Sequence, residues 1–322
     1  MRLNCNYPNN YLKFPDNVLE PKKIEVFDTS YTLYGFKFKG LNDLYDFLIQ
    51  KPKINRVVWD DDEKISSLDS DQDFHGVPYP EALEKLVQQN DPGYKEYLKI
   101  QKNIIGRSIK IHKYKDVKSI AGGVVDPVLY TTGSPLIYNT SRLVSKPNFI
   151  TIDIQVAYRC CTSINQVFNR AIIITNLIKA LERNGYSVNV NSFMLAYKND
   201  EIIQAVFEIK QHGQQANYQA LYKSLVDVEF FRRICFRLME ITDVRRNWPD
   251  GYGFTCEEDM ARKILHLTKD DIYFDQPHEM GIYGDDIAKD FEKTILGLKL
   301  EDHIDLSKEK EIIKQSVKVL KR

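Results

Sequence analysis

Four polar side chains in this sequence form the best candidate for a small-ligand site. They lie in a segment of alternating apolar and polar residues at 149–158 and in the loop directly after it: Asp153, Arg159, Thr162 and Ser163. In open α/β sheets, ligands bind where strands end. The loop combines a cation, hydroxyls and two thiols before a predicted helix N-terminus, which favours anions. The alternative is an ordinary loop between two elements.

A second group of residues interleaves arginines with aromatic side chains, as proteins that grip single-stranded nucleic acid do. Its members are Arg232, Arg233, Arg245, Arg246 and Trp248. Against this interpretation, Phe231, Ile234 and Leu238 repeat at the spacing of a buried helix face. The whole chain has 45 basic and 45 acidic residues, so no net charge draws it to a polyanion.

The sequence contains none of the common catalytic or cofactor-binding motifs. There is no P-loop, dinucleotide-binding glycine pattern, nucleophile elbow or zinc-protease helix. The six histidines are scattered, and the five cysteines include no C-x-x-C pair. We therefore expect no metal and no cofactor. The lack of catalytic motifs favours a protein that is not an enzyme. Reduced thiols of this kind are typical of a cytosolic protein.

Strand and helix patterns are clearest in the second half of the chain. Alternation predicts a strand at 149–158, and a nearly all-apolar helix follows at 165–183. Two strands at 187–197 and 201–209 predict an antiparallel hairpin. A helical stretch follows at 217–242, with a break near Val226. Further expected elements are short strands at 263–267 and 271–274 and a helix at 285–298.

The first half of the chain is more heterogeneous. Short strands are expected at 23–28 and 32–39 and helices at 41–50 and from Pro80, with a strand at 107–114. The acidic segment 60–73 lacks the glycine and final glutamate of a calcium-binding loop, so a solvated loop is expected. We divide the chain into a mixed α+β region at 1–148, an α/β sandwich domain at 149–300 and a charged tail or helix at 301–322.

Three segments resemble an uncharacterised family of bacteriophage and mobile-element proteins. They are FHGVPYPEAL at 74–83, AGGVVDPVLYTTGSPLIYN at 121–139, and the block that runs from IDIQVAY to ERNGYSVNV. The family brings no catalytic residues. By order of elements, the second half also resembles a von Willebrand factor A-like domain, which implies a three-layer sandwich with a mostly parallel sheet.

In that second resemblance, a divalent metal is held by an Asp-x-Ser-x-Ser signature at the end of the first strand. Here Asp153 is followed by Gln155 and Ala157. Alanine has no ligand atom and glutamine replaces a hydroxyl poorly, so the resemblance implies that the metal site is lost.

The favoured hypothesis is a non-enzymatic interaction protein of a phage or mobile element in the bacterial cytoplasm. We expect a protein partner, and the sequence is also compatible with a homo-oligomer. The alternatives are a nucleic-acid-binding protein that uses the arginine and aromatic group, and an enzyme with an unrecognised site between Arg159 and Ser163. No secretory signal and no apolar run of membrane-spanning length are present, so no membrane partner is expected.

Overall fold

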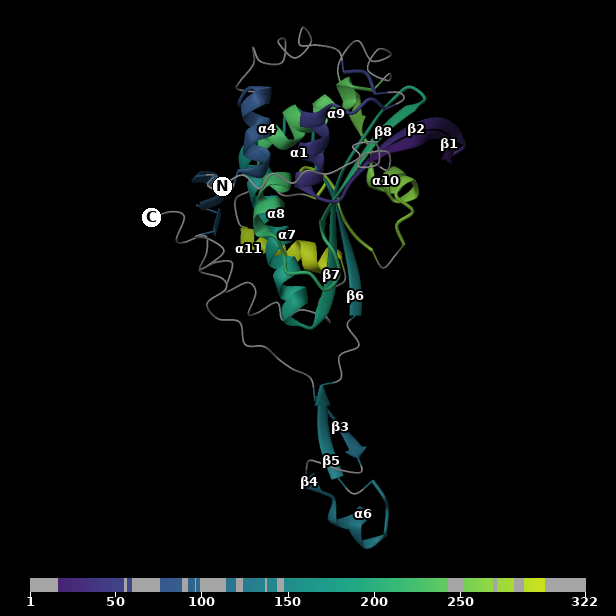
Figure 1. The fold of residues 1–322 in the computed structure, drawn as a ribbon, viewed down its shortest axis with the longest axis vertical. Coiled ribbons are helices and arrows are strands. Elements are labelled where there is room, and N and C mark those ends of the chain that lie inside the picture. Colours follow the sequence, from purple (N-terminus) through teal and green to yellow (C-terminus); the bar gives the residue numbers. More distant parts are fainter. Residues whose placement is uncertain are drawn as a thin grey trace.

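In the computed structural model, the alternating segment after residue 147 forms strand β6 (Asn148–Gln155), which lies in a large sheet (Figure 1). The structure describes residues 17–54, 57–59, 76–88, 92–95, 97–98, 114–119, 124–136, 138–143, 148–242, 252–268, 271–280 and 287–298. The acidic segment 60–73, most of the predicted strand 107–114 and the tail 301–322 lie outside these residues.

The large sheet contains seven strands within the described residues, and it combines parallel and antiparallel pairs. Besides β6, its strands are β1 (Val18–Val26), β2 (Thr29–Phe38), β7 (Tyr186–Lys198), β8 (Glu201–Lys210), β9 (Phe254–Thr255) and β10 (Ile272–Phe274). The order is β1-β2-β8-β7-β6-β10, and β9 pairs with β7. Parallel pairs join β2 to β8, β6 to β7 and β6 to β10, whereas the other pairs are antiparallel. The predicted α/β class is confirmed.

Two tight hairpins set the register of neighbouring strands. The antiparallel hairpin of β7 and β8 is confirmed, and Asn199 in its turn has a φ of 56°. Strands β1 and β2 turn at Phe27 and Asp28, whose φ values of 50° and 62° suit a turn that follows the twist of the strands. Because β2 pairs with β8, the N-terminal hairpin extends the same sheet as the second half of the chain.

One face of the sheet packs on helix α7 (Ile164–Arg183), as the sequence predicts for the apolar helix at 165–183. Ile152 and Ile154 point into this core, and Ile172 to Ile178 are buried because the helix is covered on several sides. Helices α1 (Leu41–Gln50), α4 (Tyr79–Val87), α8 (Tyr218–Leu225) and α11 (Ile287–Gly297) complete this layer.

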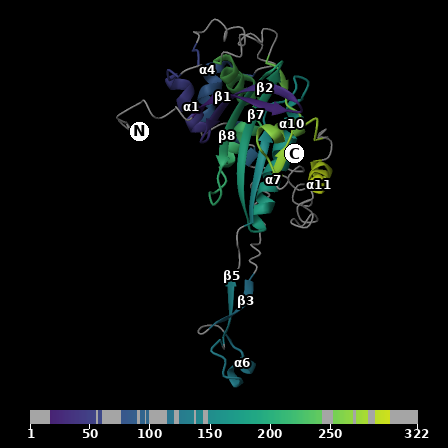
Figure 2. The ribbon, with the colours of Figure 1, turned by 90° about the vertical axis from the view of Figure 1, so that its right-hand side faces the viewer.

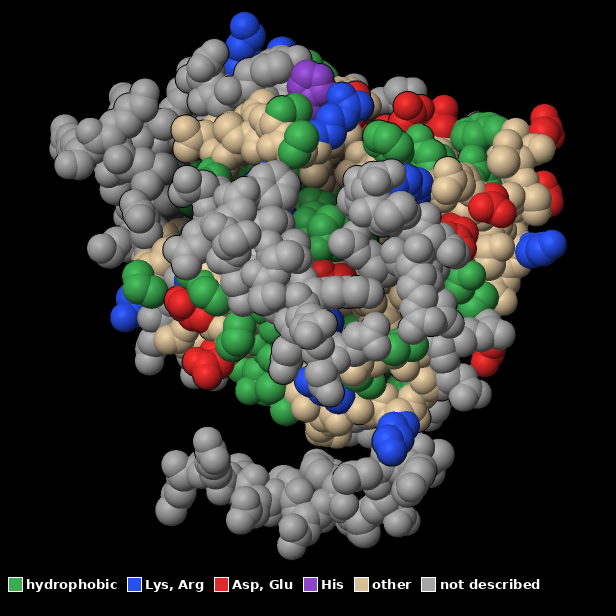
Figure 3. Space-filling model, turned by 90° about the horizontal axis from the view of Figure 1, so that it is seen from above, with side chains coloured by type: hydrophobic (Ala, Val, Ile, Leu, Met, Phe, Trp, Pro, Cys, Tyr) green, Lys and Arg blue, Asp and Glu red, His purple; other side chains and the backbone are tan. Residues whose placement is uncertain are grey.

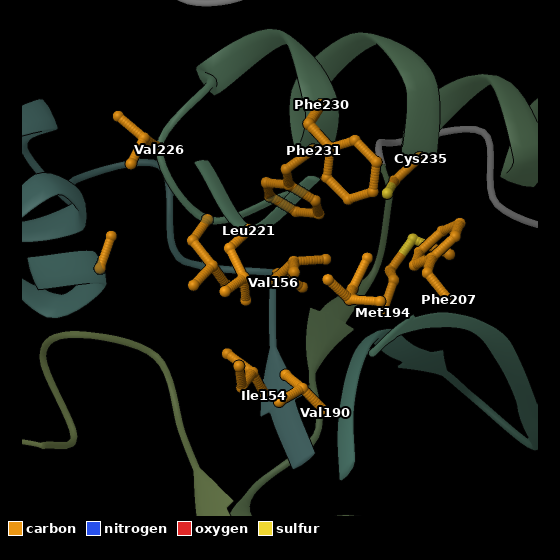
Figure 4. Packing of buried hydrophobic residues seen from close by; sticks show 14 of the residues in the cluster. Ile154, Val156, Val190, Met194, Phe207, Leu221, Val226, Phe230, Phe231 and Cys235 are labelled. Atoms are coloured by element: carbon orange, nitrogen blue, oxygen red, sulfur yellow. The ribbon is translucent and has the colours of Figure 1, made fainter. Parts of the chain in front are cut away.

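The helical stretch after β8 is interrupted near Val226, as predicted. Helix α8 ends at Leu225, and a π-helical segment η2 (Phe230–Cys235) runs directly into α9 (Phe236–Glu240). Figure 4 shows Phe230 and Phe231 of η2 lying over Val156 and Met194 of the sheet. The aromatic residues of this segment therefore belong to the core, as their spacing predicts.

The opposite face of the sheet carries a second, smaller core under helix α10 (Glu258–Ile264). Met260 and Ile264 pack there against Phe193 and Tyr273. The predicted strand at 263–267 is wrong. Because Met260, Ala261 and Ile264 share one helix face, the segment continues α10, and the helix stops near His266, whose φ is 54°.

The segment before β6 forms a separate three-stranded sheet, with order β3-β5-β4, that projects from the main body (Figures 1 and 2). Its elements are β3 (Tyr114–Ser119), β4 (Val124–Val125), α6 (Pro127–Thr131) and β5 (Tyr138–Leu143). Within the residues that the structure describes, no helix is both long and apolar enough to cross a membrane.

Candidate binding cleft

A cavity of about 1090 Å³ opens where the parallel strands of the sheet end. Strands β6 and β10 finish at Gln155 and Phe274, and the residues that follow each strand line the cavity. Beyond the end of β6, the short strand β9 takes its place beside β7 by pairing with Ala196 and Tyr197. Segments η2 and α9 and the start of α10 supply the remaining described walls. We call this cavity the cleft.

The cleft has aromatic walls and a rim rich in carboxylates. Its aromatic lining residues are Tyr158, Tyr197, Phe231, Phe236, Tyr252 and Phe254. Its charged lining residues are Arg159, Arg232, Glu257, Glu258, Asp259, Asp275 and Glu279. Figure 3 shows the molecule from above the view of Figure 1, with hydrophobic side chains visible near the middle and several acidic side chains toward the upper right.

Asp275, the residue directly after β10, is the most deeply buried carboxylate of the lining, with 7% of its surface exposed. Its Oδ1 accepts a hydrogen bond from the Gln276 amide at 2.7 Å and one from the Tyr273 hydroxyl at 3.5 Å. Burial raises the pKa of Asp275 to about 6, and the Gln276 amide opposes this rise. The carboxyl group is therefore mostly ionised at neutral pH and becomes neutral in mild acid.

A buried arginine ties together the strand ends that form the floor of the cleft. Arg170 of α7 is 1% exposed, and its Nη1 donates to the backbone oxygens of Gln155 and Asp275, each at 2.8 Å. Burial lowers the pKa of Arg170 to about 10, so the guanidinium stays charged at neutral pH. One side chain of α7 thus holds the two loops that follow β6 and β10.

The structure separates the four residues of the predicted small-ligand site. Arg159 lies at the cleft, where its Nη2 is 2.9 Å from Glu279 Oε1, and Cys160 and Cys161 line the cleft beside it. Thr162 is buried, and its Oγ1 has no hydrogen-bond partner among the residues that the structure describes. Ser163 caps α7. Asp153 lies beneath α10, where its Oδ1 accepts a hydrogen bond from Asn191 at 3.0 Å.

The arginine and aromatic group is divided as well. Arg232 and Arg233 are only 6% and 1% exposed. Arg232 lies over the ring of Tyr158 and donates to the carbonyl oxygen of Cys160, whereas Arg233 donates to that of Val77 at 2.8 Å. These contacts leave little of either guanidinium for a phosphate. Arg245, Arg246 and Trp248 lie outside the described residues.

Sequence reasoning missed the acidic half of the cleft. Asp275 and Gln276 directly follow the predicted strand at 271–274, so the rule that ligands bind at strand ends could have identified them. Glu257 gave no such signal, because only the pairing of β9 with β7 brings it to the same place.

The described residues offer no conventional metal centre. Nowhere in the described part of the chain do three or more His, Cys, Asp or Glu side chains group closely enough to hold a metal ion. Burial raises the pKa of the Cys256 thiol to about 12 and that of Cys235 well above its usual value, so both are neutral, unreactive core residues.

Comparison with known proteins places the chain in a family. Residues 20–302 match the family described as "Domain of unknown function (DUF7192)", and the chain therefore belongs to it. No curated protein and no solved structure matches the chain.

Proposed function

We propose that this member of the DUF7192 family is a non-enzymatic interaction protein that holds part of a partner protein in the cleft. The observation that carries the proposal is the cleft itself, where the exposed ring of Phe254 and the half-buried rings of Tyr197 and Tyr252 lie at the end of the sheet. Phe254 at its rim is 66% exposed. Exposed aromatic residues around a concave site are typical of surfaces that bind a partner.

The chemistry of the described lining supports binding over turnover. It contains no histidine, so the thiols of Cys160 and Cys161 have no imidazole base among these residues. Arg170 holds the backbone at Asp275 by donating to its carbonyl oxygen, and a site that is ordered before binding suits recognition.

The biological setting is part of the same proposal. We infer a bacteriophage or mobile genetic element protein that acts in the bacterial cytoplasm, which the resemblance of segments 74–83 and 121–139 supports. The likeness of the second half to a von Willebrand factor A-like sandwich is a proposal of the same kind. It is supported by helices on both faces of the sheet.

The proposal is tested by quantitative affinity capture from bacterial lysate with three versions of the tagged protein. These are the wild type, Phe254→Asp at the cleft rim and Val124→Asp on the projecting sheet, where Val124 is 73% exposed. We expect at least one protein to be retained by the wild type and the Val124 variant and to fall about tenfold with Phe254→Asp. Identical captured sets for all three proteins would contradict the proposal.

A second candidate function is an enzyme whose site includes the loop from Arg159 to Ser163. The observation that favours it is a carboxyl group with a pKa of about 6 that shares the cleft with two exposed thiols. Under this alternative, pure protein turns over a substrate, and Asp275→Asn abolishes the turnover. Arg159→Ala and Cys160→Ser without any change in function would remove this alternative.

Nucleic-acid binding remains a further proposal, which now depends mainly on Arg245, Arg246 and Trp248. Phosphate contacts release counterions, so the affinity for a single strand would fall steeply with salt. A gel shift that is absent at about 50 mM salt, or independent of salt, counts against it.

A further inference from the structure

The charged groups of the cleft do not balance. Its described lining carries five carboxylates and two guanidinium groups. Arg159 pairs with Glu279 at 2.9 Å, and Glu258 pairs with Arg262, outside the lining, at 2.7 Å. No ion pair reaches Glu257, Asp259 or Asp275 from any residue that the structure describes, and Arg232, the second lining cation, lies over the ring of Tyr158.

The most buried of these three carboxylates has an unused oxygen. Oδ1 of Asp275 has two donors, but no hydrogen bond or ion pair reaches its Oδ2 from any residue that the structure describes. This oxygen is not among the buried polar atoms that lack a partner, so it is accessible at the surface of the cleft. The cleft therefore offers a strong acceptor that a ligand with N–H donors would satisfy.

The walls around this acceptor suit an organic cation. The ring centres of Phe236 and Tyr252 lie 3.7 Å apart in a stacked pair, and a second pair of lining rings, Tyr197 and Phe254, lies at 6.1 Å. Aromatic faces attract cations, and guanidinium is more weakly hydrated than ammonium and stacks on rings. Arg232 already shows this contact inside the protein, since its guanidinium lies 5.0 Å from the ring centre of Tyr158.

We propose that the cleft binds an arginine side chain of the partner protein, with the Asp275 carboxylate as counter-ion and the aromatic walls around the guanidinium. The inference rests on the proposed function and names the group that the cleft recognises. Glu257 and Asp259 at the rim attract basic residues that flank this arginine. The same carboxylates repel phosphate, so a nucleic acid does not enter the cleft.

The test is an NMR titration of isotope-labelled protein with two probes of the same shape. Nα-acetyl-arginine amide carries the charge, and Nα-acetyl-citrulline amide replaces the guanidinium by a neutral urea. We expect the arginine probe to shift the backbone amides of residues 255–259 and those of Asp275, Gln276, His278 and Glu279. The citrulline probe should bind about tenfold more weakly, because the charge-assisted hydrogen bond is lost.

Three substitutions that each remove one carboxylate complete the experiment. Asp275→Asn keeps an acceptor for the Gln276 amide and should weaken binding of the arginine probe about tenfold. Glu257→Gln, at an exposed position, should weaken it about twofold and preserves the test should the Asp275 variant not fold. The matched control is Glu84→Gln on the outer face of α4, which should bind as the wild type does.

The possible outcomes separate this inference from the proposed function. Equal affinity for the two probes, or no shift in the cleft with either of them, overturns the arginine inference. In that case the proposed function stands as long as Phe254→Asp still removes a captured protein. Conversely, charge-dependent binding of the arginine probe without any protein lost in the capture experiment supports the inference on the ligand and contradicts the proposed function.

Discussion

Two carboxyl groups of this protein, those of Asp153 and Asp275, are buried, and each has a pKa raised to about 6 chiefly by burial. Asp275 lies at the cleft. Asp153 is 5% exposed under α10, and within the described part of the chain its Oδ2 has no hydrogen-bond partner. For Asp153, the Asn191 hydrogen bond lowers the pKa, Asp271 raises it and Arg262 lowers it. Both groups therefore favour folding in the protonated form.

This burial gives the protein a defined pH dependence of stability. An ordinary aspartate carboxyl group has a pKa of 3.8, whereas the pKa of Asp153 in the folded state is about 6. The folded state therefore holds the proton more tightly, and the free energy of unfolding falls as the pH rises from 4 through 6. At about 1.4 kcal/mol for each pKa unit, the loss for this group is on the order of 2 to 3 kcal/mol.

We expect Asp153→Asn to reduce the change in unfolding free energy between pH 4 and pH 6 by about half, because Asp275 still titrates. The measurement is urea unfolding at several pH values between 4 and 7.5. The control is Glu84→Gln, which also removes one carboxyl group but at an exposed position. A variant curve parallel to that of the wild type would show that Asp153 does not titrate in this range.

The carboxyl group of Asp275 also predicts how ligand binding depends on pH. Burial raises its pKa most, Glu279 and Glu258 raise it further, and the Gln276 amide and Arg170 lower it. The arginine probe requires the ionised form, so its affinity should fall as the pH drops through about 6. NMR titrations at pH 7.5 and pH 5 measure this, and a larger affinity at pH 5 would be incompatible with Asp275 as the counter-ion.

At the scale of single elements, side-chain hydrogen bonds in the first turn stabilise helix α7. Ser163 Oγ accepts a hydrogen bond from the Gln166 amide at 3.3 Å, and Gln166 Oε1 accepts one from the Ser163 amide at 2.9 Å. This reciprocal pair is a capping box, which satisfies amides that the helix itself leaves free. The hydroxyl of this predicted ligand-binding residue is thus engaged in starting the helix that carries Arg170.

Ser163→Ala should lower the free energy of unfolding by about 1 kcal/mol, because the Gln166 amide loses its acceptor. Ser163→Asp keeps an acceptor at the same place and should restore most of the loss. Denaturant unfolding of the two variants makes the comparison. Equal stability of the alanine and aspartate variants would mean that the cap contributes nothing measurable.

At the scale of the whole molecule, the three-stranded sheet between residues 114 and 143 stands apart from the main body (Figure 2). Its described strands pair only with one another, and Tyr114 and Leu143, at its two ends, are partners across one strand pair. The chain therefore leaves and returns at one place, as an inserted unit does.

Replacing residues 114–143 by two glycines should leave the main unfolding transition within about 1 kcal/mol of the wild type. Calorimetry measures this transition. The contrasting variant lacks the β1–β2 hairpin, residues 18–38, whose second strand pairs with β8 from Thr32 to Phe38, and this hairpin should not be removable. Loss of cooperative unfolding in the first variant would show that the projecting sheet is part of the main fold.

Local patterns in the sequence were sufficient for the main elements. The alternation at 149–158, the apolar helix at 165–183 and the hairpin that follows are confirmed, because each depends on the spacing of neighbouring residues. The strand predicted at 263–267 failed because a short apolar run fits a strand and a helix end equally well.

The sequence by itself therefore determined the α/β class, the central strands and helix, and a strand end as one wall of a site. Only the tertiary structure decided what lies opposite that wall. Asp275 and the residues around Glu257 come from segments far along the chain, and pairing of β9 and β10 with the sheet brings them to Arg159. Likewise, Arg233 is buried because Val77, 156 residues earlier, supplies its acceptor. Spacing along a chain describes neighbours on one element, whereas burial and charge balance depend on which elements pack together.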